Sequence, residues 1–278
     1  MTLMTVSAAT PQRGARPVVV RPRATGPLTF AADTLLLTRR HLRVTLRTPQ
    51  LIVLAAITPI MFVLLFRYVF GGAMHVPGYT SYVAYLLPGI IVQTALFGGS
   101  SSAVGVAEEM SGGITDRLRS LPTNRAAILA SRTFADMIRL TATMLLVVGV
   151  GVLVGFRVHA GAGPALGAFA IAVLFGYACA WLFTLLGLLV RNAESATLAG
   201  FLVTFPLVFA SSAFTSTATM PGWLRTFADA QPVTHVADAV RELSQGRPAA
   251  HAIEESLVWS CALLVAAATL AAWRFHKA

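Results

Sequence analysis

The sequence is poor in charged residues. Only 12% of its 278 residues are charged, against roughly 25% in a soluble globular domain, while 56% are hydrophobic and the mean hydropathy is +0.73. This balance excludes a soluble globular protein and predicts an integral membrane protein.

Lysine is nearly absent. Lys277 is the only one, and it follows no glycine-rich turn. A P-loop requires a lysine after such a turn, because its ammonium group must reach the β- and γ-phosphates of the nucleotide. The chain therefore does not hydrolyse ATP by that route.

Cysteine and clustered histidine are also scarce. Cys179 and Cys261 both lie in apolar runs, which excludes a disulfide framework and a cysteine-based metal site and indicates packing residues. The six histidines are scattered without ligand spacing. We therefore expect no catalytic residue, no metal site and no cofactor bound by this chain.

Long apolar runs set the fold class. They predict an all-α membrane protein with six transmembrane helices, since about 20 apolar residues span the hydrocarbon core. The spans are expected at about residues 51–70, 83–107, 138–156, 165–190, 196–214 and 253–273. Between the first two spans an outer loop is expected, with Tyr79, Tyr82 and Tyr85 as anchors at the membrane interface.

The N-terminal part is basic. Residues 1–27 mix arginine with proline and contain no apolar segment, which predicts a disordered cytoplasmic tail ahead of a transmembrane domain over residues 28–278. Residues 28–48 follow a helical pattern with Arg39, Arg40, Arg43 and Arg47 on one face. This predicts an interfacial helix on the inner leaflet, with a solvated basic linker as the alternative.

Two short half-apolar segments precede the last span. Trp223 and Phe227 belong to the first, and Val233, Val236 and Val240 to the second. They predict two short helices joined at Pro232, too short to span, that lie at the outer interface or dip into the bilayer.

The charge of +10 has a topological explanation. If both termini are cytoplasmic, all but five of the 21 basic residues lie on the inner side, where basic residues gather. The five on the outer side are Arg67, Arg157, Arg225, Arg241 and Arg247. Both termini are therefore expected in the cytoplasm, and no nucleic-acid partner is needed to explain the charge.

A charged island follows the second span. The pair Gly112 and Gly113 breaks the helix, and Ile114, Leu118 and Leu121 then recur on one face of a short helix. The other faces carry Asp116, Arg117 and Arg119. The pattern predicts a docking helix for a partner protein on the inner side.

The spans lack an internal energy source. No carboxylate or histidine is expected within their hydrocarbon depth, where ion-coupled transporters carry ionisable relays. Asp136 is expected to pair with Arg132 and Arg139 at the membrane edge, as a structural residue. A motor on a separate chain is therefore expected to act through the docking helix.

Two regions of the sequence resemble the ABC-2 type permeases, and within that family the daunorubicin-resistance type of drug-export permease. The first runs from Glu108 to Gly113 and continues through 118–122 and 132–136. The second, before the last span, comprises 221–224, 231–234 and 237–241. The resemblance covers about residue 28 to the end.

The resemblance implies a permease subunit of an exporter in the cytoplasmic membrane of a bacterium, moving hydrophobic or amphiphilic compounds. It implies two cytoplasmic ATPase subunits that bind ATP and Mg, and a second permease copy, identical or related. Residues 114–121 would be the coupling helix, and 28–47 the elbow helix. The alternatives are export of polysaccharide or lipid-linked envelope precursors, and a non-transport anchor or sensor subunit.

A substrate path is expected along the second and fifth spans. Its candidate residues are Gly98, Gly99, Ser101, Ser102, Phe201, Phe205, Phe209 and Ser212. The small residues among them also fit a second interpretation, tight helix packing. The hinge or gate candidates are Glu108, Glu109, Gly112 and Gly113, and the alternative for the two glutamates is that they are solvated helix-end charges.

Overall fold

The computed structural model of the chain describes residues 27–72, 76, 78–79, 81–112, 125–190 and 192–277. The predicted N-terminal tail and the predicted coupling helix, residues 114–121, lie outside the described residues.

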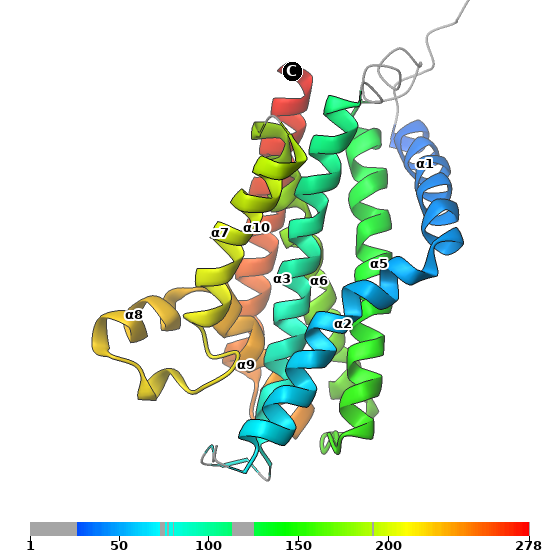
Figure 1. Ribbon diagram of the computed structural model, residues 1–278. Coiled ribbons are helices and arrows are strands. Elements are labelled where there is room, and N and C mark those ends of the chain that lie inside the picture. Colours follow the sequence, from blue (N-terminus) through cyan, green and yellow to red (C-terminus); the bar gives the residue numbers. More distant parts are fainter. Residues whose placement is uncertain are drawn as a thin grey trace, which may run out of the picture.

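Across the described ranges the chain is helical and has no strand, as the sequence predicted (Figure 1). Its elements are α1 (Pro27–Arg47), α2 (Pro49–Leu65), the π-helix η1 (Phe66–Phe70), α3 (Tyr82–Ser111), α5 (Arg125–Leu153), α6 (Ala162–Leu189), α7 (Ala193–Phe209), the 3₁₀-helix η2 (Thr217–Thr219), α8 (Gly222–Ala230), α9 (Pro232–Gln245) and α10 (Ala250–Lys277).

Within the described part, five helices are long and apolar enough to cross a membrane. They cover Ile52–Phe70, Tyr82–Ser111, Ala127–Leu153, Ala162–Leu189 and Ala250–Phe275. These correspond to five of the six predicted spans.

The remaining predicted span, the fifth in chain order, is shorter than expected. We predicted residues 196–214, but α7 is a 17-residue helix that ends at Phe209. Pro206 lies in its last turn and has no N–H to donate to the helix. The residues that follow leave the helical path and bond to side chains of other helices.

The helix α3 is the centre of the fold. Most of its residues are buried, and it packs against α2, α5, α6, α7 and α9 (Figure 1). Small residues permit the close contact with α6: a Cβ at Gly187 would lie 2.5 Å from the carbonyl oxygen of Ala103. Likewise, a Cβ at Gly99 would lie 2.9 Å from the Cβ of Cys179. At Gly99 and Ala103 the small residues of α3 thus serve tight packing, one of the two interpretations from the sequence.

The segment after α7 depends on side chains of α3 and α9 for its hydrogen bonds. The carbonyl of Ser212 accepts from the Tyr85 hydroxyl at 2.8 Å and from Nη2 of Arg241 at 2.9 Å. Non-helical backbone inside an apolar environment is tolerated only where protein groups satisfy it. These two donors meet that requirement at Ser212.

Two further carbonyls of the same segment are satisfied in the same way. The Tyr82 hydroxyl donates to the carbonyl of Phe214 at 2.9 Å, and Nε2 of Gln231 donates to the carbonyl of Ala210. Tyr82 and Tyr85 are only 5% and 4% exposed. The prediction that they anchor the chain at the membrane interface was therefore wrong, because their hydroxyls serve the broken segment.

Arg241 holds α9 to this region. It is 2% exposed, its Nε donates to the carbonyl of Tyr85 at 3.1 Å, and it forms an ion pair with Asp238. Its guanidinium also lies 3.8 Å from the centre of the Tyr85 ring. The sequence placed Arg241 among the outer basic residues and gave no sign that it is buried.

The two predicted short helices are confirmed as α8 and α9, joined at Pro232. They differ in burial. Helix α9 packs against α3, α6 and α10 and buries Val233, Val236 and Val240, whereas α8 projects from the side of the molecule (Figure 1). Trp223 of α8 is 76% exposed. Of these two helices, α8 is therefore the one that presents an aromatic side chain of the kind that lies at a membrane interface.

We predict that Tyr82→Phe lowers the stability of the protein in detergent by about 1 kcal/mol, because the Phe214 carbonyl loses its donor. Reversible unfolding in mixed micelles measures the change. Tyr68→Phe is the matched control, since Tyr68 is 73% exposed. Equal stability of the two variants would show that the Tyr82 hydroxyl does not stabilise the non-helical segment after α7.

Candidate functional site

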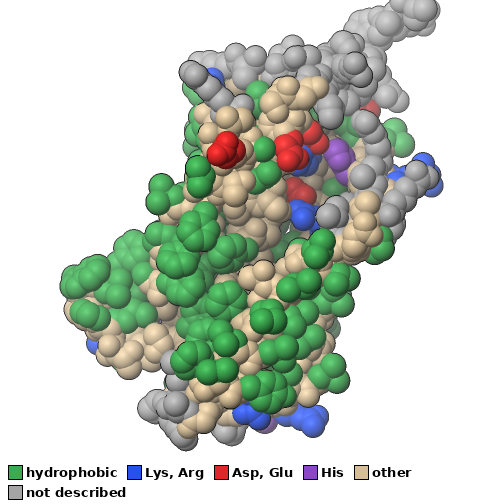
Figure 2. All heavy atoms as spheres, viewed as in Figure 1, with side chains coloured by type: hydrophobic (Ala, Val, Ile, Leu, Met, Phe, Trp, Pro, Cys, Tyr) green, Lys and Arg blue, Asp and Glu red, His purple; other side chains and the backbone are tan. Residues whose placement is uncertain are grey.

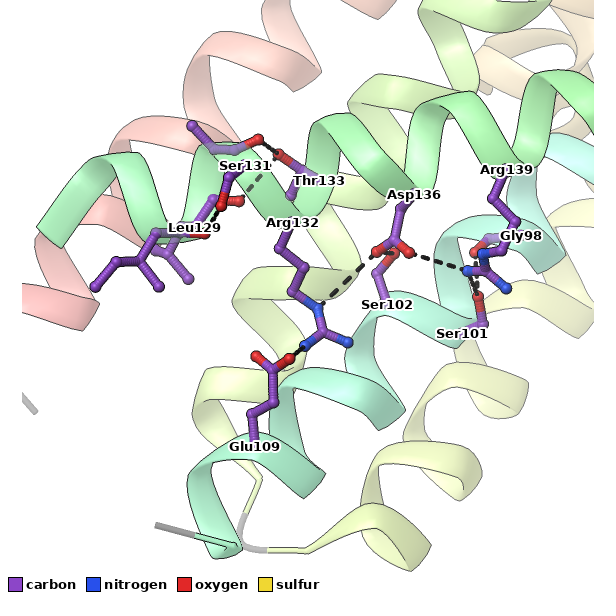
Figure 3. Close-up of polar contacts among 12 residues, drawn as sticks. Gly98, Ser101, Ser102, Glu109, Leu129, Ser131, Arg132, Thr133, Asp136 and Arg139 are labelled. Atoms are coloured by element: carbon purple, nitrogen blue, oxygen red, sulfur yellow. Dashed lines mark hydrogen bonds and ion pairs between the residues drawn. The ribbon is translucent and has the colours of Figure 1, made fainter. Parts of the chain in front are cut away.

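Charged and hydroxyl side chains meet between α3 and α5 (Figure 3). We define the α3–α5 polar cluster as the residues Ser101, Ser102 and Glu109 of α3 and Arg132, Asp136 and Arg139 of α5. It lies in the C-terminal half of α3 and the N-terminal half of α5.

Asp136 is the centre of this cluster. Its Oδ2 accepts a hydrogen bond from Ser102 Oγ at 2.7 Å, and its Oδ1 accepts one from Arg139 Nη2 at 3.1 Å. Nε of Arg132 lies 4.0 Å from Oδ2. The sequence predicted both arginine partners but not Ser102, because a serine of another helix leaves no mark in the local spacing.

Arg132 links the two helices a second time. It forms an ion pair with Glu109 near the C-terminal end of α3. Gly105 makes room for it, since a Cβ there would overlap Nη2 of Arg132. The charges of Glu109, Arg132, Asp136 and Arg139 sum to zero, which offsets the cost of removing each from water.

Asp136 lies in the N-terminal half of one continuous helix. The sequence placed it at the membrane edge, on a helix that begins amphipathically and continues into the span expected from residue 138. In the structure α5 begins at Arg125, and the candidate span within it covers the 27 residues Ala127–Leu153. Asp136 lies about 14 Å along α5 from Ala127, at 1.5 Å per residue. Because 27 residues are more than the roughly 20 that cross the hydrocarbon core, the position of Asp136 at the membrane edge stays a prediction.

A cavity of about 300 Å³ adjoins the cluster between α2, α3 and α5. Ser101 and Arg139 contribute to both the cluster and the cavity wall. Gln93 and Phe97 of α3 and Thr143 of α5 also line it. Sequence reasoning missed Gln93, whose only signal is that it is a lone amide in an apolar run.

The predicted path residues of α3 lie in different surroundings. Gly98 and Ser101 line the cavity, and Ser101 accepts a hydrogen bond from Arg139 Nη2 at 2.7 Å. Ser102 points to Asp136, and Gly99 packs against α6.

The predicted path residues of α7 form a separate surface. Phe201, Phe205 and Phe209 stand in a row, with successive ring centres 5.1 and 4.4 Å apart, and are 55%, 44% and 41% exposed. Ser212 is buried in the break, where its hydroxyl donates to Asp238. Within the part of the chain that the structure describes, no single cavity joins these residues to Gly98 and Ser101.

The hinge candidates divide as follows. Glu108 is exposed, Glu109 pairs with Arg132, and Gly112 follows the last residue of α3. Gly113 lies outside the described residues, as do the coupling candidates Ile114, Asp116, Arg117, Leu118, Arg119 and Leu121.

Comparison with known proteins gives consistent matches. Residues 32–243 match the ABC-2 type transporter family. The chain is 34% identical over 188 residues to a daunorubicin resistance ABC transporter permease of Streptomyces coeruleorubidus, across 68% of this chain and 66% of that protein. It is 31% identical over 250 residues to a probable doxorubicin resistance ABC transporter permease of Mycobacterium tuberculosis, across 90% of each.

We predict a coupling energy of about 1–2 kcal/mol between Glu109 and Arg132, from the stabilities of Glu109→Ala, Arg132→Ala and the double variant in micelles. The pair is largely buried, at 28% and 15% side-chain exposure, so water screens it little. The control pair, Arg225 and Asp229, is 54% and 47% exposed and should give less than about 0.5 kcal/mol. Equal coupling in both pairs would refute this difference.

Proposed function

Because the chain belongs to the ABC-2 type transporter family, we propose that it is the membrane permease subunit of an exporter that moves hydrophobic or amphiphilic compounds out across the cytoplasmic membrane of a bacterium. The observation that carries this proposal is the similarity to permeases named for daunorubicin and doxorubicin resistance. The permease itself is not an enzyme.

The proposed complex contains two cytoplasmic ATPase subunits, which bind ATP and Mg, and a second permease copy, identical or related. The lack of any lysine apart from Lys277 supports a separate ATPase. In this arrangement the chain crosses the membrane six times, with α7 as the fifth crossing and both termini in the cytoplasm. The gathering of arginine on that side supports the orientation.

Energy enters this complex through residues 114–121. That segment connects the end of α3 to the start of α5, and the Glu109–Arg132 ion pair ties the same two helix ends together. A push from the ATPase on the segment therefore moves α3 and α5 as one unit. Because α3 is the central helix, this motion reaches the helices that enclose the transport path.

We predict that Leu118→Glu abolishes association with the ATPase, because it places a charge in the apolar stripe that the sequence predicts for the coupling helix. Co-purification with the tagged ATPase measures the effect. Ser111→Glu is the control: it adds the same charge at an exposed position at the end of α3 and should leave the complex intact. Recovery of an intact complex with Leu118→Glu would show that residues 114–121 are not the docking element.

The exporter function is tested with inverted membrane vesicles that contain the permease and a candidate Walker-motif ATPase subunit. We expect ATP-dependent uptake of daunorubicin, and none with the permease alone or with an ATPase whose Walker lysine is replaced. Uptake of an envelope polysaccharide precursor in place of the drug would assign the chain to a different cargo class. A complex that forms but moves neither would indicate an anchor or sensor subunit.

A further inference from the structure

The cavity between α2, α3 and α5 has the size and the lining of a small-molecule site. Its volume of about 300 Å³ is at the lower end of the range for ligand pockets, roughly 300–1,000 Å³. Figure 2 shows acidic and basic side chains gathered at a hollow beside a broad apolar surface. Leu54, Phe97 and Leu140 supply an apolar part of the cavity wall.

Gln93 gives this cavity an unmet hydrogen-bonding group. The residue is 2% exposed, and its Oε1 is buried without a hydrogen-bond partner among the described residues. A buried acceptor without a partner destabilises the protein, because it has lost its hydrogen bonds to water. A ligand with a hydroxyl group would remove that destabilisation.

Arg139 supplies donors to the same cavity. The hydrogen bonds that it makes to Ser101 and Asp136 both leave from Nη2. Within the described part of the chain, its Nε and Nη1 have no hydrogen-bond partner, so they can donate to a carbonyl oxygen. The hydroxyls of Thr94 and Thr143 donate to backbone carbonyls of their own helices, which leaves their lone pairs as acceptors.

The charges around the cavity select against an ionic ligand. Arg139 already pairs with Asp136, and Arg132 with Glu109, so the cluster is neutral as a whole. A free anion or cation would leave one of these charges in excess at low dielectric. An uncharged group that both donates and accepts hydrogen bonds fits the lining.

The cavity opens beside α2, where Leu54, Ala55 and Thr58 of its wall are exposed. We expect this side of α2 to face lipid in a bilayer. Ser101 lies about 15 Å from the end of α3 at Ser111, measured at 1.5 Å per residue. In the orientation proposed above, the polar end of the cavity therefore lies in the inner half of the membrane.

We propose that this cavity binds an uncharged amphiphile that enters from the inner leaflet. Its apolar body lies against Leu54, Phe97 and Leu140, and its hydroxyl and carbonyl oxygens meet Gln93 and Arg139. Two kinds of molecule have this chemistry: the exported compound and a neutral lipid such as a diacylglycerol. The first identification rests on the proposed function, and the second does not.

The test uses the full-length permease alone in nanodiscs, without ATPase. The two probes are tritiated daunorubicinone, the uncharged aglycone of daunorubicin, and tritiated dioleoylglycerol. Saturable binding of the first identifies the exported compound as the occupant, and saturable binding of the second identifies the lipid. Failure of both probes to bind overturns the proposal.

Three variants locate the binding. Gln93→Leu should weaken it roughly tenfold through the lost hydrogen bond, and Ala55→Trp should abolish it by filling the mouth of the cavity. Leu65→Trp is the control, because Leu65 is exposed on the same helix and lies outside the cavity. Unchanged binding in both cavity variants overturns the proposal.

Stability without ligand separates a binding role of Gln93 from a structural one. Because Oε1 has no partner among the described residues, Gln93→Leu should raise or preserve the melting temperature of the ligand-free protein. The same variant should reduce the increase in melting temperature that the ligand causes. If Gln93→Leu instead lowers the melting temperature of the ligand-free protein and also weakens binding, Gln93 is structural and its assignment as a ligand contact is overturned. If the unmodified permease binds neither probe in a complex that still transports daunorubicin, this site alone is overturned. If the unmodified permease binds a probe but its complex transports nothing, the proposed function alone is overturned.

Discussion

The structure depends on one constraint: every backbone polar group in an apolar environment needs a partner. Regular helices satisfy it by themselves, and the chain departs from them after Phe209. There the backbone carbonyls that have no partner within a helix accept hydrogen bonds from Tyr82 and Tyr85 of α3, and from Gln231 and Arg241. The break therefore determines where α3 and α9 must lie, and it explains a fully buried arginine in a chain with little charge.

The same central helix carries a second polar region toward its other end. Ser102 and Glu109 bind Asp136 and Arg132 of α5, so hydrogen bonds and ion pairs attach α3 to its neighbours near both of its ends. Between these two regions its contacts are apolar and close, through glycines and alanines. A helix attached in this way has the mechanical property that the proposed function requires of it.

Several features could be predicted because they depend on local sequence. The apolar runs gave the helices, Pro232 gave the joint between α8 and α9, and the spacing of Arg132, Asp136 and Arg139 gave their ion pairs. Pro206 marked a break in the predicted span, but the end of α7 at Phe209 was missed because Ala213 and Phe214 extend the apolar character of the segment beyond Ser211 and Ser212.

The sequence by itself determined the all-helical membrane fold, the family, and the absence of an ATP-binding lysine. Tertiary structure decided that Gln93 lines a cavity, that Ser102 faces Asp136, and that Arg241 is buried rather than solvated. The physical reason is sequence distance. Arg241 binds a carbonyl 156 residues away and Ser102 a carboxylate 34 residues away, and such partners meet only when helices pack. Periodicity reports which face of a helix is apolar, but not which residue of another helix it meets.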